Sequence, residues 1–563
     1  MVRQAGVSDV ELLKQSDPTL GGSIGEVLKN PELDRFSDND LQFLKFHGIY
    51  QQDDRDKRKT GKQYIFMVRG RIPGGVVPPA QYLAFDELSR RHGNDTLRIT
   101  SRQSFQWHGV VKKELGPLMR GINDALSSTL AACGDVNRNV MAPPTPARSA
   151  LAEKVLTDAR AVSAALLPST RAYHEIWVEG MPLKLAPDQP STFEDPLYGR
   201  QYLPRKFKVA FAIPPLNDTD VFTNCLGLVA VANPDHPAEL LGYNLLAGGG
   251  QGMSHGNQAT FPRVADVIGF FPAGRVVEVA RAVVTVFRDF GDRTNRKHAR
   301  LKYVLAERGP AWFRAEVEAQ TGFTLEPARP FTFERQGDLF GWQRQNDGHW
   351  FLGLYVETGR IADKPAHQLK TALQSIIATH QPEIHLTPSQ NLILAGISDD
   401  QMDAITQALA AHGIPVENQA AAVRRASMAF VALPTCGLAL AEAERAMPGL
   451  LDQLEALLRE LGLCDEEIIV RMTGCPNGCA RPFMAEIALV GRAPGLYSLY
   501  LGGTPASTRL NREYRASVKA EDIIGELRPL LARWKNERTG RERFGDWVER
   551  VLWREMPAEP LPA

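Results

Sequence analysis

The stretch Arg98-Ile-Thr100-Ser-Arg-Gln103 has a counterpart in His385-Leu-Thr387-Pro-Ser-Gln390, which lies 287 residues further along the chain. A second pair of similar segments, Gly70-Arg71-Ile72 and Gly359-Arg360-Ile361, has a spacing of 289 residues. Short matches can arise by chance, but these occur in the same order at nearly the same spacing, which favours a duplicated unit. We therefore expect a pseudo-twofold protein whose functional site lies between two halves.

The residues around the first copy change from a strand pattern to a helix pattern and back. An apolar strand at 65–68 is followed by Gly70-Arg-Ile-Pro-Gly-Gly75, a helical run and a second strand within 97–110. Leucines at helical spacing within 449–461 predict an amphipathic helix that faces a core. Residues 1–60 are polar and charged, so we interpret them as a partly ordered arm. These patterns predict the α+β class.

The composition is that of a large globular chain with balanced charge. Of 563 residues, 44% are hydrophobic, and Lys+Arg and Asp+Glu number 65 each. This balance argues against a globally basic nucleic-acid binder, so any charge-driven function must be local. No apolar stretch approaches the roughly 18 to 20 residues of a membrane span, and the N-terminus lacks the apolar block of a signal peptide. We therefore expect a cytoplasmic protein with no membrane contact.

Two cysteines lie close together in Thr473-Gly-Cys475-Pro-Asn-Gly-Cys479. Six cysteines in a chain of this length cannot form a disulfide framework. A turn rich in Pro, Asn and Gly can direct two thiolates at one inorganic cluster and present backbone N–H groups to its sulfides. Two buried thiols flanking a turn are an alternative. A zinc site is another, but it needs a second pair of ligands that the sequence does not supply.

Local positive charge is the second chemical signal. Many Arg and Lys residues lie next to apolar strands or glycines, without acidic partners at helical spacing. Any one of them could belong to a solvated basic face, whereas together they favour an anion site, because buried cations need anionic partners. The set comprises Arg69, Arg71, Arg98, Arg102, Arg138, Arg205, Lys206, Lys208, Arg293, Arg296, Lys297, Arg300 and Lys302. The glycine run 248–252 lacks the spacing of a dinucleotide motif, which leaves a tight turn or a close approach to a ligand.

Seven motifs follow one another along the chain, namely His47-Gly-Ile-Tyr-Gln-Gln-Asp-Asp-Arg55, Arg71-Ile-Pro-Gly-Gly75, Arg98-Ile-Thr-Ser-Arg-Gln103, Asn137-Arg138-Asn139, Leu203-Pro-Arg-Lys-Phe-Lys208, Pro434-Thr-Cys-Gly-Leu-Ala-Leu-Ala-Glu-Ala-Glu-Arg445 and Thr473-Gly-Cys-Pro-Asn-Gly-Cys479. Together they resemble the nitrite/sulfite reductase family of siroheme proteins, and within it the assimilatory sulfite reductase hemoproteins. The resemblance runs from about residue 40 to Phe544-Gly-Asp-Trp547 and includes the cysteine loop at 473–479. It implies a siroheme coupled to a [4Fe–4S] cluster through a shared cysteine, and the six-electron reduction of sulfite to sulfide in sulfate assimilation and cysteine biosynthesis. It also implies an NADPH-dependent flavoprotein subunit as the electron-donating partner.

The resemblance also implies a three-part fold with an internal pseudo-twofold repeat. The expected parts are an N-terminal arm at 1–60 that docks a partner, a first ferredoxin-like half repeat at 61–131, a central siroheme and substrate-binding domain at 132–328, a second ferredoxin-like half repeat at 329–417 and an iron–sulfur cluster and siroheme domain at 418–563.

Residue roles carry over from the resemblance position by position. The substrate cage corresponds to Arg71, Arg138, Lys206 and Lys208. Siroheme carboxylates are expected to meet Arg98, Arg102, Arg293, Arg296, Arg300 and Lys302, with Gly249 and Gly250 behind the macrocycle and Asn477 near the cluster. Cys479 corresponds to the cysteine that bridges cluster and siroheme iron, and Cys436 and Cys475 correspond to further cluster ligands.

One position departs from the family pattern. Phe430 stands where the fourth cluster cysteine is expected, and phenylalanine has no donor atom, so one cluster iron would lack a protein thiolate or take another ligand. Cys133, Cys225 and Cys464 are not placed at that iron by the sequence. Two alternatives therefore stay open. One is a ferredoxin-dependent nitrite reductase, since nitrite enzymes of the family tend to carry Asn in place of Lys208. The other is a catalytically impaired siroheme-binding protein.

Overall fold

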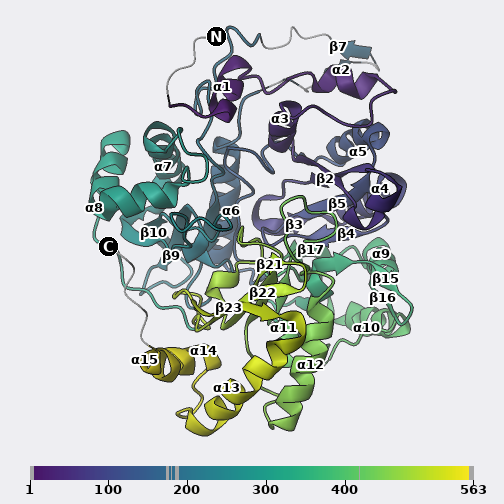
Figure 1. Ribbon diagram of the computed structural model, residues 1–563, viewed down its shortest axis with the longest axis vertical. Coiled ribbons are helices and arrows are strands. Elements are labelled where there is room, and N and C mark those ends of the chain that lie inside the picture. The colour runs from purple at the N-terminus through teal and green to yellow at the C-terminus, as the bar shows by residue number, and fades with distance from the viewer. Residues whose placement is uncertain are drawn as a thin grey trace.

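The computed structural model describes residues 6–170, 172, 176–178, 181–183, 189–417 and 419–556. Within these ranges, four sheets of four or five strands carry the architecture, and helices pack against them (Figure 1). One large hydrophobic core lies within residues 20–416 and a second one lies within residues 423–553. The mixture of helices and sheets confirms the predicted α+β class.

The first half repeat is a five-stranded sheet in the order β1-β2-β5-β4-β14. The helices α4 (Pro79–His92) and α5 (Lys112–Asp124) pack on it. Four strands come from the N-terminal part of the chain and the fifth comes from the second half. The strands are β1 (Ile49–Asp53), β2 (Tyr64–Arg69), β5 (Phe105–Val110), β4 (Leu97–Ile99) and β14 (Arg360–Ile361).

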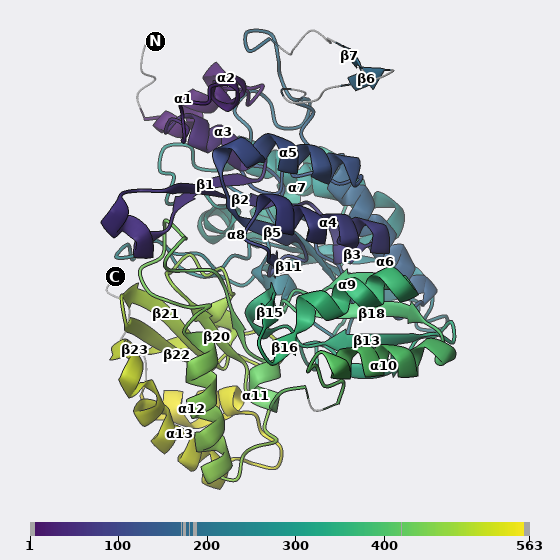
Figure 2. The same ribbon diagram turned by 90° about the vertical axis from the view of Figure 1, so that its right-hand side faces the viewer.

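The second half repeat has the same layout, with the strand order β12-β13-β18-β17-β3. Its helices are α9 (Leu369–His380) and α10 (Met402–Ala411), and α9 packs beside α4 (Figure 2). Each half thus contributes a two-residue strand to the sheet of the other half. This exchange joins the two halves across a pseudo-twofold axis. The strands are β12 (Gly341–Arg344), β13 (Trp350–Leu354), β18 (Leu392–Ile397), β17 (Glu383–Leu386) and β3 (Val76–Val77).

The strand register corrects one of the two sequence matches. Arg98 lies opposite Arg360, and its equivalent His385 lies opposite Val76. The counterpart of Arg360 is therefore Val76, so the match of Gly70–Ile72 to Gly359–Ile361 is wrong. The equivalent glycines are Gly75 and Gly359. Both have positive φ, and a Cβ on either would lie within 2.8 Å of a carbonyl oxygen of the opposite half.

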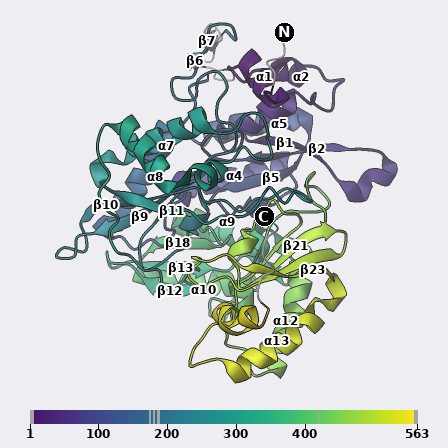
Figure 3. The same ribbon diagram turned by 60° about the vertical axis from the view of Figure 1, so that its left-hand side comes forward.

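The duplication extends beyond the half repeats. In the central part, β8 (Val209–Ala212) and β9 (Leu226–Ala232) lie 261 residues before β20 (Val470–Thr473) and β21 (Ile487–Ala493) in the C-terminal part, and both pairs are parallel. Helices α7 (Val276–Phe290) and α13 (Ile523–Glu537) are 247 residues apart. Figure 3 shows α7 and α8 beside the central sheet. The other strands and helices of the central and C-terminal parts are β10 (Leu240–Ala247), β11 (Asp266–Pro272), α8 (Leu301–Thr321), β19 (Met428–Ala429), α12 (Met447–Glu460), β22 (Leu496–Leu501) and β23 (Arg512–Lys519).

The N-terminal segment is more ordered than the predicted arm. Its helices α1 (Asp9–Ser16), α2 (Ile24–Lys29) and α3 (Asp40–Phe46) dock on the body through buried apolar side chains such as Phe43. Lys14 is fully buried beside Glu11. Residues 1–5 lie outside the described ranges. The smaller elements are α6 (Ala150–Ala165), β6 (Ile176–Val178), β7 (Met181–Leu183), β15 (Asp363–Lys364), β16 (His367–Gln368), α11 (Ala422–Arg425), α14 (Phe544–Trp547) and α15 (Trp553–Glu555).

Helix α12 buries Leu450, Leu451, Leu454, Leu457 and Leu458, as its leucine spacing predicted. Across the described part of the chain, every helix is too short or too polar to cross a bilayer.

Candidate functional site

Three cysteines gather at the ends of two neighbouring strands of the C-terminal sheet. Cys475 and Cys479 lie on the loop after β20, and Cys436 lies on the loop after β19. Burial and the nearby Cys479 raise the pKa of Cys436, and the same causes raise the pKa of Cys475 to about 12. The Asn477 amide nitrogen lies 3.6 Å from the Cys475 sulfur. The structure thus brings the three predicted cluster cysteines and Asn477 together.

The glycine run packs directly on this cysteine loop. The Met253 N–H donates to the Pro476 carbonyl at 2.8 Å, and a Cβ at Gly252 would lie 3.1 Å from the Asn477 oxygen. A Cβ at Gly250 would lie 3.0 Å from the Arg300 guanidinium. A Cβ at Gly249 would lie 2.1 Å from a carbonyl oxygen. The small residues therefore let the loop and a cationic side chain approach the backbone closely.

A cluster of cations lies next to the cysteine loop. Lys206 and Lys208 flank the buried Phe207 just before β8, so their side chains share one face. Burial, followed by repulsion from Arg300, lowers the pKa of Lys206 to about 7, and Cys479 opposes this shift. Burial and the neighbouring Lys206 lower the pKa of Lys208 well below its usual range. We name Arg102, Lys206, Lys208 and Arg300 the cation cluster.

The cation cluster has no carboxylate of its own in the described part of the chain. Among the described residues, the ion pairs next to it join Arg205 and Arg296 to Asp135, and none joins a member of the cation cluster to an acidic side chain. Arg102 donates instead to Asn224 at 2.9 Å and to two main-chain carbonyls. The Arg300 Nε and both polar side-chain atoms of Gln251 are buried without a hydrogen-bond partner among the residues that the structure describes. Buried cations and orphaned donors of this kind require an anion to balance them.

Arg138 extends this positive region toward β1. Its Nε donates to the Gly134 carbonyl at 2.9 Å. Burial alone would lower its pKa, but Tyr50, Cys133 and Asp135 raise it above the ordinary value. Arg138 is also among the cations that lower the pKa of Lys206, so the structure places it beside the cation cluster.

Other predicted site residues have partners elsewhere in the chain. The Arg71 guanidinium donates to the hydroxyl of Ser163 at 2.6 Å and to its carbonyl. Arg98 is fully buried, lies 3.5 Å from the Glu444 carboxylate and donates to a carbonyl of β19. The structure therefore does not bring Arg71 or Arg98 to the cation cluster, because each guanidinium reaches a nearer acceptor.

The cations of the basic stretch 293–302 also differ in their partners. Arg293 forms an ion pair with Glu11 of α1, and Arg296 binds Asp135 at 2.8 Å. Lys302 donates to the Gly252 carbonyl at 2.7 Å, and burial lowers its pKa to about 6. Within this stretch, Arg300 joins the cation cluster and Lys302 lies beside it, because repulsion from Arg300 and Lys206 adds to burial in lowering the pKa of Lys302. Arg293 instead attaches helix α1 through Glu11, and Arg296 attaches the segment between α5 and α6 through Asp135.

Comparison with known proteins identifies the family. The ferredoxin-like half domain of nitrite/sulfite reductases matches residues 57–125 and 343–412, and the nitrite and sulphite reductase 4Fe–4S domain matches residues 157–325. The sulfite reductase [NADPH] hemoprotein beta-component of Myxococcus xanthus is 49% identical, with 99% of each chain covered. The chain belongs to the nitrite/sulfite reductase family. The resemblance predicted from the motifs is confirmed.

Two further relatives agree with this assignment. The hemoprotein beta-component of Geobacillus kaustophilus is 46% identical over 97% of this chain and 95% of its own length. The solved structure of Mycobacterium tuberculosis NirA has a TM-score of 0.78 and 25% identity, with coverage of 98% and 97%. The three-part nitrite/sulfite reductase fold with its internal repeat is thus confirmed.

The residues present in this nitrite/sulfite reductase fit the family's cofactors, siroheme and an iron–sulfur cluster. The cation cluster has unbalanced positive charge and orphaned donors, as carboxylates of a macrocycle would require. In the described part of the chain, no group of three acidic, His or Cys side chains converges on a single metal ion. Cys436, Cys475 and Cys479 would instead each bind a different iron of one cluster.

Phe430 fills the position of the missing family cysteine with an aromatic ring. The Arg98 guanidinium carbon lies 4.9 Å from the centre of this ring, and Arg98 in turn faces Glu444. Cys225 lies 3.4 Å from the Arg300 guanidinium, Cys133 is buried beside Tyr50, and Cys464 is exposed. The described structure of this nitrite/sulfite reductase therefore groups none of these three cysteines with the cluster ligands.

Sequence reasoning missed two residues that position the cysteines. The two Nη atoms of Arg55 donate to the carbonyls of Cys436 and Ala439, both at 2.9 Å, which holds the Cys436 loop. Arg55 is the last residue of the family motif that begins at His47. Its position in that motif was the signal from which its role could have been found. Arg481 lies two residues after Cys479 and binds the buried Asp220. Nothing local in the sequence pairs these two positions.

Proposed function

We propose that this chain reduces sulfite to sulfide and receives its electrons from a separate flavoprotein subunit in sulfate assimilation. The observation that carries the proposal is the cation cluster, which lies beside Cys479 and has no carboxylate partner among the described residues. A dianion such as sulfite gains more from several close cations than a monoanion does. The two lysines on one face favour sulfite over nitrite.

The residues of the cation cluster would bind the anion and deliver protons. When bound, the siroheme and the cluster would pass the donor's electrons to the substrate. Lys206 and Lys208 would hold the oxygen atoms, and each oxygen must leave as water. A lysine with its pKa near 7 releases a proton readily at neutral pH, so Lys206 is suited to donate to a departing oxygen.

A basic and apolar surface beside the Cys436 loop supports a protein electron donor. Leu438 is 67% exposed, although it lies only two residues after Cys436. Lys57, Lys59 and Lys62 are exposed on the neighbouring segment, which Arg55 ties to the same loop. An acidic partner would be drawn to this surface by charge. We propose that the docking role expected of residues 1–60 lies at this end, in residues 55–62.

The test is steady-state kinetics on the holoprotein with sulfite and with nitrite. A siroheme absorption spectrum and faster turnover of sulfite than of nitrite are expected. Lys208→Asn should narrow the ratio of the two specificity constants, because it removes one of the charges that a dianion uses most. A ratio that stays the same or widens would exclude Lys208 as the discriminating residue. Absence of siroheme from the purified protein would exclude the proposed reaction.

A further inference from the structure

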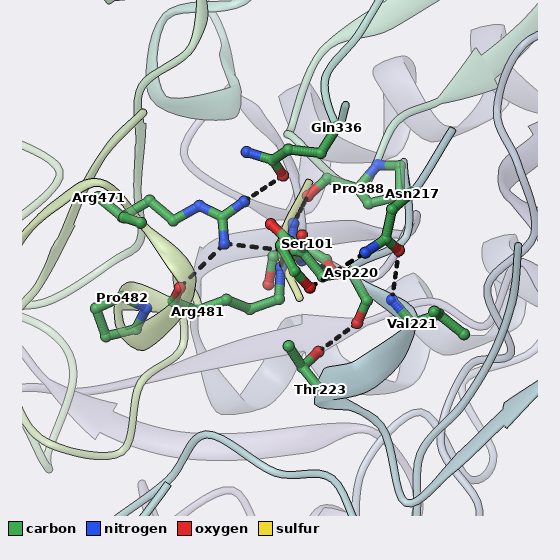
Figure 4. Close-up of polar contacts among 12 residues, drawn as sticks. Ser101, Asn217, Asp220, Val221, Thr223, Gln336, Pro388, Arg471, Arg481 and Pro482 are labelled. Atoms are coloured by element: carbon green, nitrogen blue, oxygen red, sulfur yellow. Dashed lines mark hydrogen bonds and ion pairs between the residues drawn. The ribbon is translucent and has the colours of Figure 1, made fainter. Parts of the chain in front are cut away.

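A buried ion pair lies where the duplicated units meet (Figure 4). Asp220 precedes the 3₁₀ turn Val221–Thr223, and Arg481 precedes the turn Pro482–Met484, 261 residues later. Both residues have left-handed backbones, with φ values of 47° and 52°. They are therefore equivalent positions of the two repeats, and they carry opposite charges. The Arg481 Nε donates directly to the Asp220 carboxylate.

The same guanidinium contacts both half repeats. Arg481 Nη1 donates to the Ser101 carbonyl at 2.7 Å, and Nη2 donates to the Pro388 carbonyl at 2.9 Å. Ser101 and Pro388 are themselves equivalent, since they lie 287 residues apart within the matched segments. Arg481 thus binds two symmetry-related carbonyls and lies at the pseudo-twofold axis. All parts of the duplicated structure meet at this one side chain.

A second arginine completes the network. Arg471 on β20 lies 2.9 Å from the same Asp220 oxygen, and it donates to the Arg481 carbonyl at 3.0 Å. Asp220 is fully buried, so its charge depends on these two partners. Burial alone would raise the pKa of Asp220, but Arg471 and Arg481 hold it below its ordinary value. The carboxylate therefore stays ionised between them.

The network is connected to the cysteine loop on both sides. Ser101, whose carbonyl Arg481 binds, donates its hydroxyl to the Cys479 carbonyl at 2.9 Å. The Arg481 N–H donates to the Gly478 carbonyl at 3.0 Å. The end of the loop is thus held between the first half repeat and Asp220. A shift of Arg481 would move Cys479 relative to Ser101.

We propose that Asp220 is a positioning residue that fixes the cysteine loop through Arg481 and so determines how firmly the iron–sulfur cluster is held. The proposal rests on the proposed function in one respect, that Cys475 and Cys479 are cluster ligands. Partners that orient metal ligands from behind typically change metal affinity about 10- to 100-fold when they are lost.

The first test uses the cofactor-free full chain. Asp220→Asn keeps the shape of the side chain and removes its charge. We expect the alkylation rate of the buried Cys475 to rise above that of the wild type, because a loop that is no longer held exposes the thiol. The alkylation rate of Cys133, which is buried outside the cysteine loop, is measured in the same sample by mass spectrometry. A rise confined to Cys475 indicates a displaced loop, whereas an equal rise at both cysteines would overturn the proposal.

The second test uses the holoprotein. Iron release to a chelator should be about 10- to 100-fold faster in Asp220→Asn than in the wild type. Glu486→Gln is the matched control, because Glu486 is also fully buried and its carboxylate binds Arg543 at 2.8 Å in the same C-terminal unit. This control should leave iron release unchanged. Equal rates in all three proteins would overturn the proposal, and a wild type that binds no cluster would instead count against the proposed function.

A charge reversal keeps the proposal testable if Asp220→Asn does not fold. In Asp220→Arg/Arg481→Asp the two side chains exchange equivalent positions, so the new arginine can reach the same pair of carbonyls. The double variant should release iron more slowly than Arg481→Asp alone. A double variant that is as labile as this single variant would show that the ion pair does not position the loop.

Discussion

At the scale of single residues, Lys206 combines a role in anion binding with a penalty for folding. Burial lowers its pKa from 10.5 to about 7, so the folded chain holds this proton less tightly than the unfolded chain. Burial of the charged Lys206 lowers the free energy of unfolding by its full amount below pH about 7, and this loss of stability decreases as the pH rises toward 10.5. Lys206→Met should therefore stabilise the cofactor-free chain at neutral pH and lower sulfite turnover roughly 10- to 1000-fold.

Thermal unfolding across this pH range measures the first effect, and steady-state kinetics measure the second. Lys113→Met, a change at an exposed position, serves as the control and should change neither quantity. The siroheme spectrum should persist in Lys206→Met. A variant that is less stable than the wild type at neutral pH would contradict this account of the lysine.

Phe430 makes a second prediction at the residue scale. Three cysteines gather at the cluster position, whereas the ring of Phe430 packs under Arg98 and offers no donor atom. An iron without a thiolate is held only by sulfides and is labile. Protein purified in air should therefore contain fewer than four cluster irons per chain or a three-iron signal in electron paramagnetic resonance.

Phe430→Cys should restore the full iron count and raise sulfite turnover. Phe430→Leu is the control, because it removes the ring without adding a thiol. If the wild-type chain already holds four irons and Phe430→Cys brings no gain, then another ligand serves the fourth iron.

At the scale of elements, Glu444 joins the Cys436 loop to the strand exchange between the halves. Its carboxylate binds Arg360 of β14 at 2.8 Å and lies 3.5 Å from Arg98 of β4. Burial alone would raise its pKa, but these two arginines lower it from 4.5 to about 2. The ion pairs therefore stabilise the fold above pH about 4.5, and this contribution is lost as the pH falls toward 2.

Glu444→Gln should weaken the dependence of stability on pH in that acidic range. Equilibrium unfolding at a series of pH values measures the change. Glu442→Gln is a suitable control, since Glu442 pairs with the exposed Arg445 nearby. A pH dependence equal to that of the wild type would show that Glu444 does not link these elements.

At the scale of the whole molecule, the duplication produces two equivalent sites with different chemistry. The second-repeat counterparts of Arg138, Lys206 and Lys208 are Arg425, Glu467 and Ile469, and these line a cavity of about 610 Å³. Two of the three cations are thus lost there. The counterpart of the cysteine loop, residues 214–218, contains no cysteine.

One siroheme per chain is therefore expected, because only the first site has the positive charge that its carboxylates require. Extraction and quantification of siroheme against protein concentration measure this ratio. A ratio near two would show that the second cavity also binds the macrocycle.

The sequence alone determined features that depend on local spacing or on recognisable motifs. The leucine face of α12 and the alternation of Lys206 and Lys208 follow from periodicity, which is a property of neighbouring residues. The 287-residue repeat follows from the similarity of two short segments, which can be read from the sequence directly. The motifs identified the family and located three cysteines. The spacing of the motifs also showed that Phe430 replaces a cysteine.

Only the tertiary structure decided which partner each buried cation binds. Arg98 and Arg102 are four positions apart, yet Arg98 faces Glu444 while Arg102 joins the cation cluster. Asp220 and Arg481 are equivalent in the duplication, but their pairing depends on how the two repeats pack. A buried charge is stabilised by whichever opposite charge or polar group the fold places next to it. That neighbour can be hundreds of residues distant in the chain, so no local pattern encodes it.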